Sequence, residues 1–293
     1  MDFGPFLLLA LIEGLVTSAV LALTAVGLSL TFGVMRVVNV AHGEFFMLGA
    51  VSAWFVTSWL PVPPALAFAA ALLLCPLFVG VVAVLADMLI LKRLNYQPEA
   101  TIVATIGVLY ILQQAALTVF GPDARPVAAP FSFRIQFPWF GYSGYKLAVI
   151  VAAAAVLAGV WLLLTRTKIG LVMRATQIDR DTARAFGINV DRVYAGVFGL
   201  GAALAAIAAV LIVPIQQAHY LMGADPLLLS FIVVIIGGLG SLRGTLVAAL
   251  LIGLSDGVIS TFFAPTLAKI IATLLVALVL VFRPQGLFGK PAE

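Results

Sequence analysis

The sequence predicts an all-α polytopic integral membrane protein. Hydrophobic residues make up 63% of its 293 residues and charged residues only 10%, whereas a soluble domain carries roughly a quarter charged residues. Apolar runs of roughly 20 residues, the length that crosses a bilayer, recur along the whole chain. Basic residues gather in alternate gaps between these runs, as they do in multi-pass proteins. We therefore expect residues 1–293 to form a single transmembrane domain.

Eight apolar runs mark the candidate spans, and one is long enough for two, which gives about eight or nine transmembrane helices. No basic segment precedes the first run, so we expect it to remain as a span rather than be cleaved as a signal peptide. In the seventh run the sequence GGLGSLRG, residues 237–244, predicts a broken helix with Gly237, Gly238, Gly240 and Gly244 as its loop. The runs are residues 6–34, 37–60, 64–91, 101–120, 146–165, 194–215, 226–263 and 266–282.

The basic residues orient the chain with its N-terminus outside and its C-terminus inside. With nine crossings, twelve of the sixteen lysines and arginines fall on the inner side, and the mirror topology would reverse that ratio. The net charge of +4 therefore records topology, so we expect contact with membrane lipid and no nucleic-acid partner. The inner set is Arg36, Lys92, Arg93, Arg166, Lys168, Arg174, Arg180, Arg184, Arg192, Arg243, Arg283 and Lys290; the outer set is Arg125, Arg134, Lys146 and Lys269.

Residues 166–193 form the one long polar segment predicted on the inner face. Helical spacing and the helix-stop pair Gly187 and Asn189 predict one or two short helices outside the bilayer. Such a helix lies on the membrane surface, held by anionic lipid, or docks into a groove of a cytoplasmic partner. The candidate docking residues are Arg180, Asp181, Thr182, Ala183, Arg184 and Gly187.

The second run begins with polar side chains, Asn39, His42 and Glu44, around Gly43. Three interpretations remain open: the groups satisfy backbone ends where the helix is broken, they line the transport path, or His42 and Glu44 relay protons. Only one other histidine exists, so we expect no metal site and no catalytic residue. The candidate path or gate residues are Asn39, His42, Gly43, Glu44, Gln113 and Asp256.

Four stretches resemble the permease family of branched-chain amino acid ABC importers, in the same order along nearly the whole chain. The inner segment also contains DTARAFG, residues 181–187, which resembles the EAA motif of ABC importer permeases but departs from it at two of four positions. The stretches are ALTAVGLSLTFGVMRVVNVAHGEFFMLGA (22–50), RATQIDRDTARAFGINVDRV (174–193), VVIIGGLGSLRGTLVAALLIG (233–253) and FRPQGLFG (282–289).

This resemblance implies an inner-membrane permease of a bacterial, binding-protein-dependent importer. The implied partners are a second homologous permease subunit, two cytoplasmic ATPase subunits and a periplasmic substrate-binding protein. Branched-chain or other apolar amino acids are the implied cargo; urea, amides or aromatic acids are alternatives within the same importer type. Residues 166–193 would be the cytoplasmic coupling loop.

The residues themselves agree with a transport subunit that has no ATPase activity of its own. The chain contains no G-x-x-x-x-G-K-[ST] phosphate-binding loop, so ATP would be bound by partner subunits, and we expect no cofactor in this chain. A secondary transporter or channel is the alternative, with His42, Glu44 and Asp256 as a possible ion or proton couple. A membrane enzyme is a third hypothesis, but the chain lacks an H-E-x-x-H zinc motif.

Overall fold

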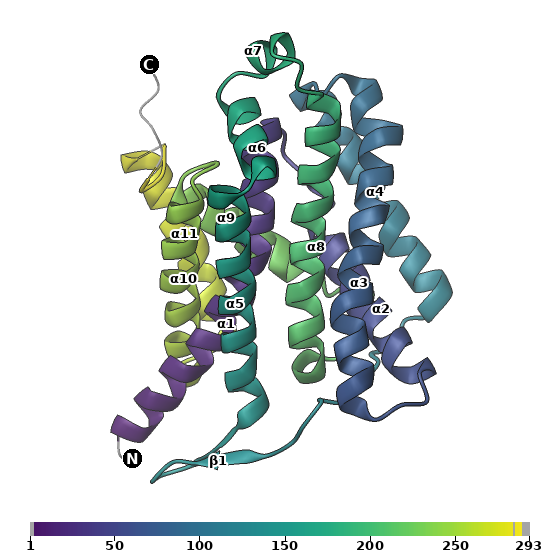
Figure 1. Cartoon of the computed structure of the whole chain (residues 1–293). Coiled ribbons are helices and arrows are strands. Elements are labelled where there is room, and N and C mark those ends of the chain that lie inside the picture. Colours follow the sequence, from purple (N-terminus) through teal and green to yellow (C-terminus); the bar gives the residue numbers. More distant parts are fainter. Residues whose placement is uncertain (1–2, 284, 289–293) are drawn as a thin grey trace.

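The computed structural model describes residues 3–283 and 285–288 and shows an upright bundle of helices (Figure 1). The predicted Lys290 lies outside the described residues. Within them, seven helical segments are long and apolar enough to cross a membrane, which confirms the all-α polytopic class. They are Gly4–Met35 in α1 (Phe3–Met35), Pro64–Leu94 in α3 (Pro64–Ala86) with its continuation as the π-helix η1 (Asp87–Leu91) and the 3-10 helix η2 (Lys92–Leu94), α4 (Pro98–Phe120), α5 (Gly144–Arg166), α8 (Val190–Gln216), α10 (Leu242–Phe262) and α11 (Pro265–Phe282).

Two further helices run inside the bundle without meeting that criterion. Helix α2 (His42–Trp59) is long enough at 18 residues, but His42 and Glu44 at its start lower its hydropathy. Helix α9 (Ala224–Gly237) has 14 residues, or about 21 Å at 1.5 Å per residue, which is shorter than the roughly 30 Å hydrocarbon core. The prediction of a broken helix is confirmed, because α9 ends at Gly237 and α10 begins at Leu242. The exact number of crossings stays a prediction.

The middle of the bundle is formed by α1 and α8. Helix α1 packs against α10, α8, α9 and α5, and α8 packs against α3 and α2. Most of α8 is buried because small residues, mainly alanine and glycine, let its neighbours approach closely. In contrast, α4 and α11 lie at the periphery with most of their apolar side chains exposed, as expected for helices that face lipid.

The two ends of the bundle differ. One end, called the α7 end here, carries α6 (Lys168–Ile178) and α7 (Arg180–Ala185), the two short helices of the predicted polar segment (Figure 1). The opposite end, called the hairpin end, carries β1 (Arg134–Gln136) paired antiparallel with β2 (Gly141–Ser143), with Ile135 opposite Tyr142. Helix α1 begins at the hairpin end and finishes near α7. The assignment of the α7 end to the cytoplasm remains a prediction from the charge distribution.

Candidate functional site

Helix α7 is a short helix whose N-terminus is capped by its own sequence. Asp179 accepts hydrogen bonds on Oδ1 from the backbone N–H groups of Asp181 at 2.9 Å and Thr182 at 3.1 Å. Its Oδ2 accepts a third from the Thr182 hydroxyl at 2.6 Å. These bonds, the Thr182 hydroxyl first, lower the pKa of the Asp179 carboxyl, and the nearby charge of Arg36 acts in the same direction. The cap therefore holds α7 in a defined geometry although the segment is exposed.

The other end of α7 closes in a Schellman motif. The N–H of Gly187 donates to the carbonyl of Arg184 at 2.9 Å, and the N–H of Ile188 donates to that of Ala183 at 3.0 Å. Gly187 has φ +83°, and no heavy atom lies within 4 Å of the position that a Cβ would take. Glycine is thus needed here for its torsion angle and not for space. The predicted helix stop lies at this residue.

The predicted docking residues divide into one buried and five exposed positions. Ala183 is 4% exposed, on the side where α7 packs against α6 and α8. Arg180, Asp181, Thr182, Arg184 and Gly187 are exposed. Two large apolar side chains that sequence reasoning missed stand beside them: Phe186 is 83% exposed and Ile178 79% exposed. The sequence pattern that could have indicated them is a large apolar residue near each end of a charged helix outside the spans. Together they make α7 a projecting surface with charged and apolar parts.

Exposed ion pairs connect α7 to the start of α8. Arg184 lies 3.5 Å from Asp191, and Asp191 lies 3.2 Å from Lys92. Within α7, Asp181 lies 3.8 Å from Arg184. Exposed pairs of this kind contribute at most about 1 kcal/mol each, so they orient α7 more than they stabilise it.

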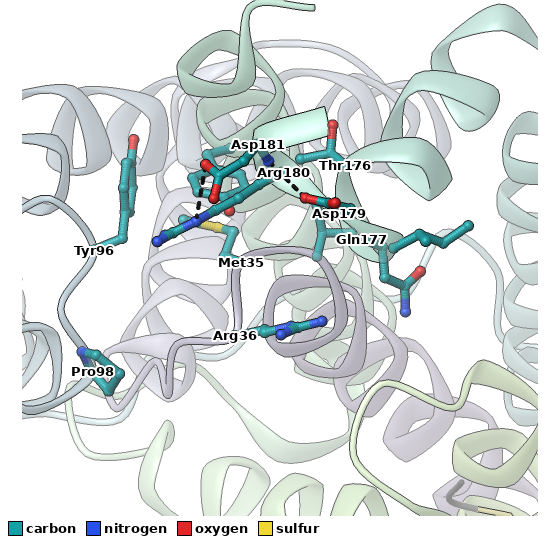
Figure 2. Close-up of a pocket in the computed structure, with 12 residues that line it drawn as sticks. Met35, Arg36, Tyr96, Pro98, Thr176, Gln177, Asp179, Arg180 and Asp181 are labelled. Carbon is teal, nitrogen blue, oxygen red and sulfur yellow. Dashed lines mark hydrogen bonds and ion pairs between the residues drawn. The ribbon is translucent and has the colours of Figure 1, made fainter. Parts of the chain in front are cut away.

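A cavity of about 490 Å³ lies beneath α7 (Figure 2). Its walls come from the end of α1, the segment between η2 and α4, the α6–α7 junction and the first turns of α8. Figure 2 shows Arg36 below Asp179 and Gln177, with Tyr96 and Pro98 across the cavity and Arg180 paired with Asp181. Arg36 has φ +57°, an uncommon value for a side chain other than glycine, where the chain leaves α1.

A second hollow of about 700 Å³ lies beside the first and contains the loop of the broken helix. Arg36, Arg174 and Gln177 line it together with Gly240 and Ser241. In the loop, Gly238 has φ +101° and Gly240 φ +77°.

The ends of the broken helix are held by close backbone contacts. A methyl group on Gly244 would overlap the carbonyl oxygen of Gly237. The carbonyl of Ile236 accepts the N–H of Leu287 at 2.8 Å, so the segment after α11 is hydrogen-bonded to the end of α9. Gly237, Gly238 and Gly244 therefore lie where two helix ends and a returning chain meet, whereas Gly240 lies against Gly33 of α1.

The start of α2 is buried deep in the bundle, five residues later than the predicted run begins. Residues 37–41 are not helical. The Asn39 side chain accepts the N–H of Ala41 at 3.1 Å, and the N–H of Val40 donates to the Thr105 hydroxyl of α4 at 3.2 Å. Asn39 thus satisfies a backbone group ahead of the helix, which is the role described by the first of the three interpretations.

His42 and Glu44 are both buried, but they face different surroundings. His42 is fully buried, and its Nε2 lies 2.9 Å from the carbonyl oxygen of Thr24 in α1. Since a carbonyl only accepts, Nε2 carries the proton; Nδ1 has no hydrogen-bond partner among the described residues. Glu44 is 3% exposed, and its Oε2 has no partner among those residues either. Between them, a methyl group on Gly43 would overlap the carbonyl oxygen of Gly223 at the start of α9.

The structure separates the other two candidate path residues. Asp256, on α10, lines a cavity at the hairpin end that also reaches Thr24, the partner of His42. Gln113 lies on α4, which packs against α2 at the opposite side of the bundle (Figure 1). The fold thus places Asp256 in a cavity that also reaches Thr24 and Phe46, and leaves Gln113 outside that cavity.

Apolar spans, a broken helix and a capped helix that projects from one end define the class of this protein: a multi-pass helical membrane protein. Residues 10–280 match the family model described as branched-chain amino acid transport system / permease component. The chain belongs to this family.

Two relatives match along nearly their full length. BraD, a high-affinity branched-chain amino acid transport system permease protein of Pseudomonas aeruginosa, is 28% identical, with 96% of this chain and 95% of BraD covered. LivH of Methanocaldococcus jannaschii, a probable branched-chain amino acid transport permease protein, is 28% identical, with 98% and 94% covered. PsaBC from Streptococcus pneumoniae, solved in complex with Fab, has a TM-score of 0.50 and 14% identity over 98% of this chain and 95% of that chain, a likeness of fold alone.

Proposed function

We propose that the chain is the permease subunit of an ATP-driven, binding-protein-dependent importer for branched-chain or other apolar amino acids. The observation that carries this proposal is the match of both relatives over nearly their whole length, since each is a branched-chain amino acid permease by name. The apolar helices fit a location in the bacterial inner membrane. A secondary transporter is not favoured, because the named relatives are subunits of transport systems.

ATP hydrolysis is assigned to partner subunits. The sequence has no phosphate-binding loop with the required lysine, so this chain supplies no ATPase site. The proposed assembly contains a second permease subunit, two cytoplasmic ATPase subunits that bind ATP, and a periplasmic binding protein that delivers cargo.

Helix α7 is the proposed contact with the ATPase. It projects from the α7 end of the bundle, is capped at both ends, and exposes Phe186 and Ile178 beside Arg180 and Arg184. A large exposed apolar side chain surrounded by charges is typical of a protein interface. Because its caps hold α7 as one unit and a cavity lies beneath it, a push from the ATPase would move the helix as a whole against α1 and α8.

The proposal is tested by purifying the tagged chain from its native host in mild detergent and identifying co-purified proteins by mass spectrometry. We expect ATPase subunits and a second permease in stoichiometric amounts. Uptake of radiolabelled leucine, urea and benzoate by a deletion strain, with and without the restored gene, then identifies the cargo. A homo-oligomer without ATPase subunits in repeated preparations would contradict the importer assembly, and uptake of urea or benzoate alone would contradict the cargo.

A further inference from the structure

The cavity at the hairpin end has the shape of a binding site for a small molecule. Its volume is about 310 Å³, at the lower end of the roughly 300–1,000 Å³ typical of small-molecule sites. Lys269, in the second turn of α11, lies toward the hairpin end of its lining, while Thr24 and Phe46 belong to helix segments deep in the bundle. Thr24 is also the residue whose carbonyl binds His42. The cavity therefore extends from near one face of the bundle to the buried start of α2.

Most of the cavity wall is apolar. The apolar lining comes from four different helices and the segment after α8, so it exists only in the folded bundle. Such a wall can take an aliphatic side chain out of water, which favours binding of a valine, leucine or isoleucine side chain. The apolar lining includes Val20, Leu21, Phe46, Ile212, Met222 and Leu229.

Three charged side chains, Asp225, Asp256 and Lys269, line this cavity, and only two of them form an ion pair. The Nζ of Lys269 lies 2.7 Å from Oδ2 of Asp225 in the first turn of α9. Asp256 is the second carboxylate of the lining; it interacts with the Ser260 hydroxyl and with the charge of Lys269, but forms no ion pair within 4.0 Å among the described residues. The Lys269 ammonium group thus forms an ion pair with Asp225, and the Asp256 carboxylate is left without one.

We propose that Asp256 receives the α-ammonium group of the amino acid cargo while the aliphatic side chain of the cargo lies against Val20, Leu21 and Phe46. This inference rests on the proposed function and deepens it. The cargo carboxylate then faces Lys269, which Asp225 holds in place. A carboxylate in a membrane helix is costly and is kept for a partner of opposite charge, and an ammonium group with three donors suits it.

The same geometry separates the cargo classes. Aromatic acids bring a carboxylate for Lys269 but no ammonium group for Asp256, which stays without a partner of opposite charge. Urea and amides have no charge to pair with Asp256. A zwitterion with an apolar side chain matches both the charged side and the apolar wall.

The test uses the complete importer, with its binding protein, reconstituted in proteoliposomes. Uptake of leucine is compared for the natural chain, Asp256→Asn, Asp256→Glu and the control Asp123→Asn, which changes an exposed aspartate in the segment between α4 and β1. We expect Asp256→Asn to lower leucine uptake about 10- to 100-fold in an importer that still assembles, as the loss of a charged hydrogen bond implies. Asp256→Glu should retain part of the uptake, and Asp123→Asn all of it.

Unchanged leucine uptake by Asp256→Asn would overturn the assignment while leaving the importer function intact. If the natural chain transports another cargo and no amino acid, the proposed function fails and the inference falls with it. If Asp256→Asn does not assemble, the test uses Val20→Phe, which fills the cavity. Normal leucine uptake by that variant overturns the site, and a loss of uptake by an importer that still assembles supports it.

Discussion

Gly187 at the α7 end and Gly43 at the start of α2 are both glycines that the fold requires, for different reasons. Gly187 has φ +83° and open space around the position of a Cβ. Gly43 has no positive φ, but the backbone of Gly223 occupies the place where its Cβ would stand. The first residue is needed for a torsion angle in an exposed turn, and the second for contact between two helices that start inside the bundle.

The difference follows from how each region is held. The turn at Gly187 is closed by hydrogen bonds within five residues along the chain. The start of α2 depends on Thr24, Thr105 and Gly223, which come from three other parts of the sequence. A locally closed helix can move as a unit, whereas a start that several helices share can only change when those helices move. We therefore expect substitution of Gly43 to disrupt the folded bundle and substitution of Gly187 to abolish uptake while the bundle stays folded.

The largest effect is expected for Gly43→Ala. The added methyl group must push α2 away from Gly223, and overpacking of a buried contact costs roughly 1–3 kcal/mol or more. We expect loss of the folded bundle, measured as aggregation in size-exclusion chromatography and a lower midpoint of thermal unfolding in detergent. Gly107→Ala on α4 is the control, because no heavy atom lies within 4 Å of its Cβ position. Equal behaviour of the two variants would contradict a close-contact role for Gly43.

Gly187→Val is expected to abolish uptake while the bundle stays intact. A β-branched residue at φ +83° is strained, by roughly 1–2 kcal/mol for the left-handed conformation, and the end of α7 must rearrange to relieve it. Gly187→Asn should retain much of the activity, since asparagine tolerates this conformation better. Membrane insertion, thermal stability and leucine uptake are measured together. Normal uptake by Gly187→Val would remove the docking role of α7.

Ala183→Asp tests whether uptake requires the packing of α7 against the bundle. Ala183 is 4% exposed, so the new carboxylate would be buried without a partner, at a cost of roughly 1–3 kcal/mol or more. We expect strongly reduced uptake and faster tryptic cleavage at Arg180 and Arg184, because α7 no longer packs against α6 and α8. Ala185→Asp places the same group at an exposed position and should not change the cleavage rate. An unchanged cleavage rate in Ala183→Asp would show that burial does not hold α7.

The smallest effect is expected for Ser241→Ala at the broken helix. Ser241 Oγ accepts the N–H of Gly244 at 3.2 Å and caps α10. Loss of such a cap costs about 1 kcal/mol, and we expect the midpoint of thermal unfolding to fall by about 2–4 °C. Ser255→Ala, in the interior of the same helix, is the matched control. A larger loss would indicate that the loop is held by this one hydrogen bond rather than by the glycine contacts around it.

Several features were predictable because their cause lies close by in the sequence. The apolar runs predicted the spans, the cluster of glycines at residues 237–244 predicted the break between α9 and α10, and Gly187 predicted the end of α7. Each of these signals acts within one turn or one helix. The hairpin of β1 and β2 had no such signal in the sequence pattern.

Other features were wrong or absent in the prediction because their cause lies far away in the sequence. The second span was predicted from residue 37, but α2 begins at His42, since residues 37–41 bond to α4 and to Asn39 instead of continuing a helix. The path roles of Gln113 and Asp256 stay predictions, and the fold adds that their helices, α4 and α10, lie at opposite sides of the bundle. Polarity within a span says that a group needs a partner, but not which helix provides it.

By itself, the sequence determined that this protein is a helical membrane protein of the permease family, where its helices break, and which segment forms short helices outside the spans. Hydropathy, glycine torsion angles and helix caps are local properties, so one sequence suffices for them. Only the tertiary structure decided that the start of α2 meets α9, that a cavity lies beneath α7, and that Asp256 and Lys269 share a cavity with Thr24. These depend on which surfaces pack together, because a contact between distant segments is determined by the whole bundle.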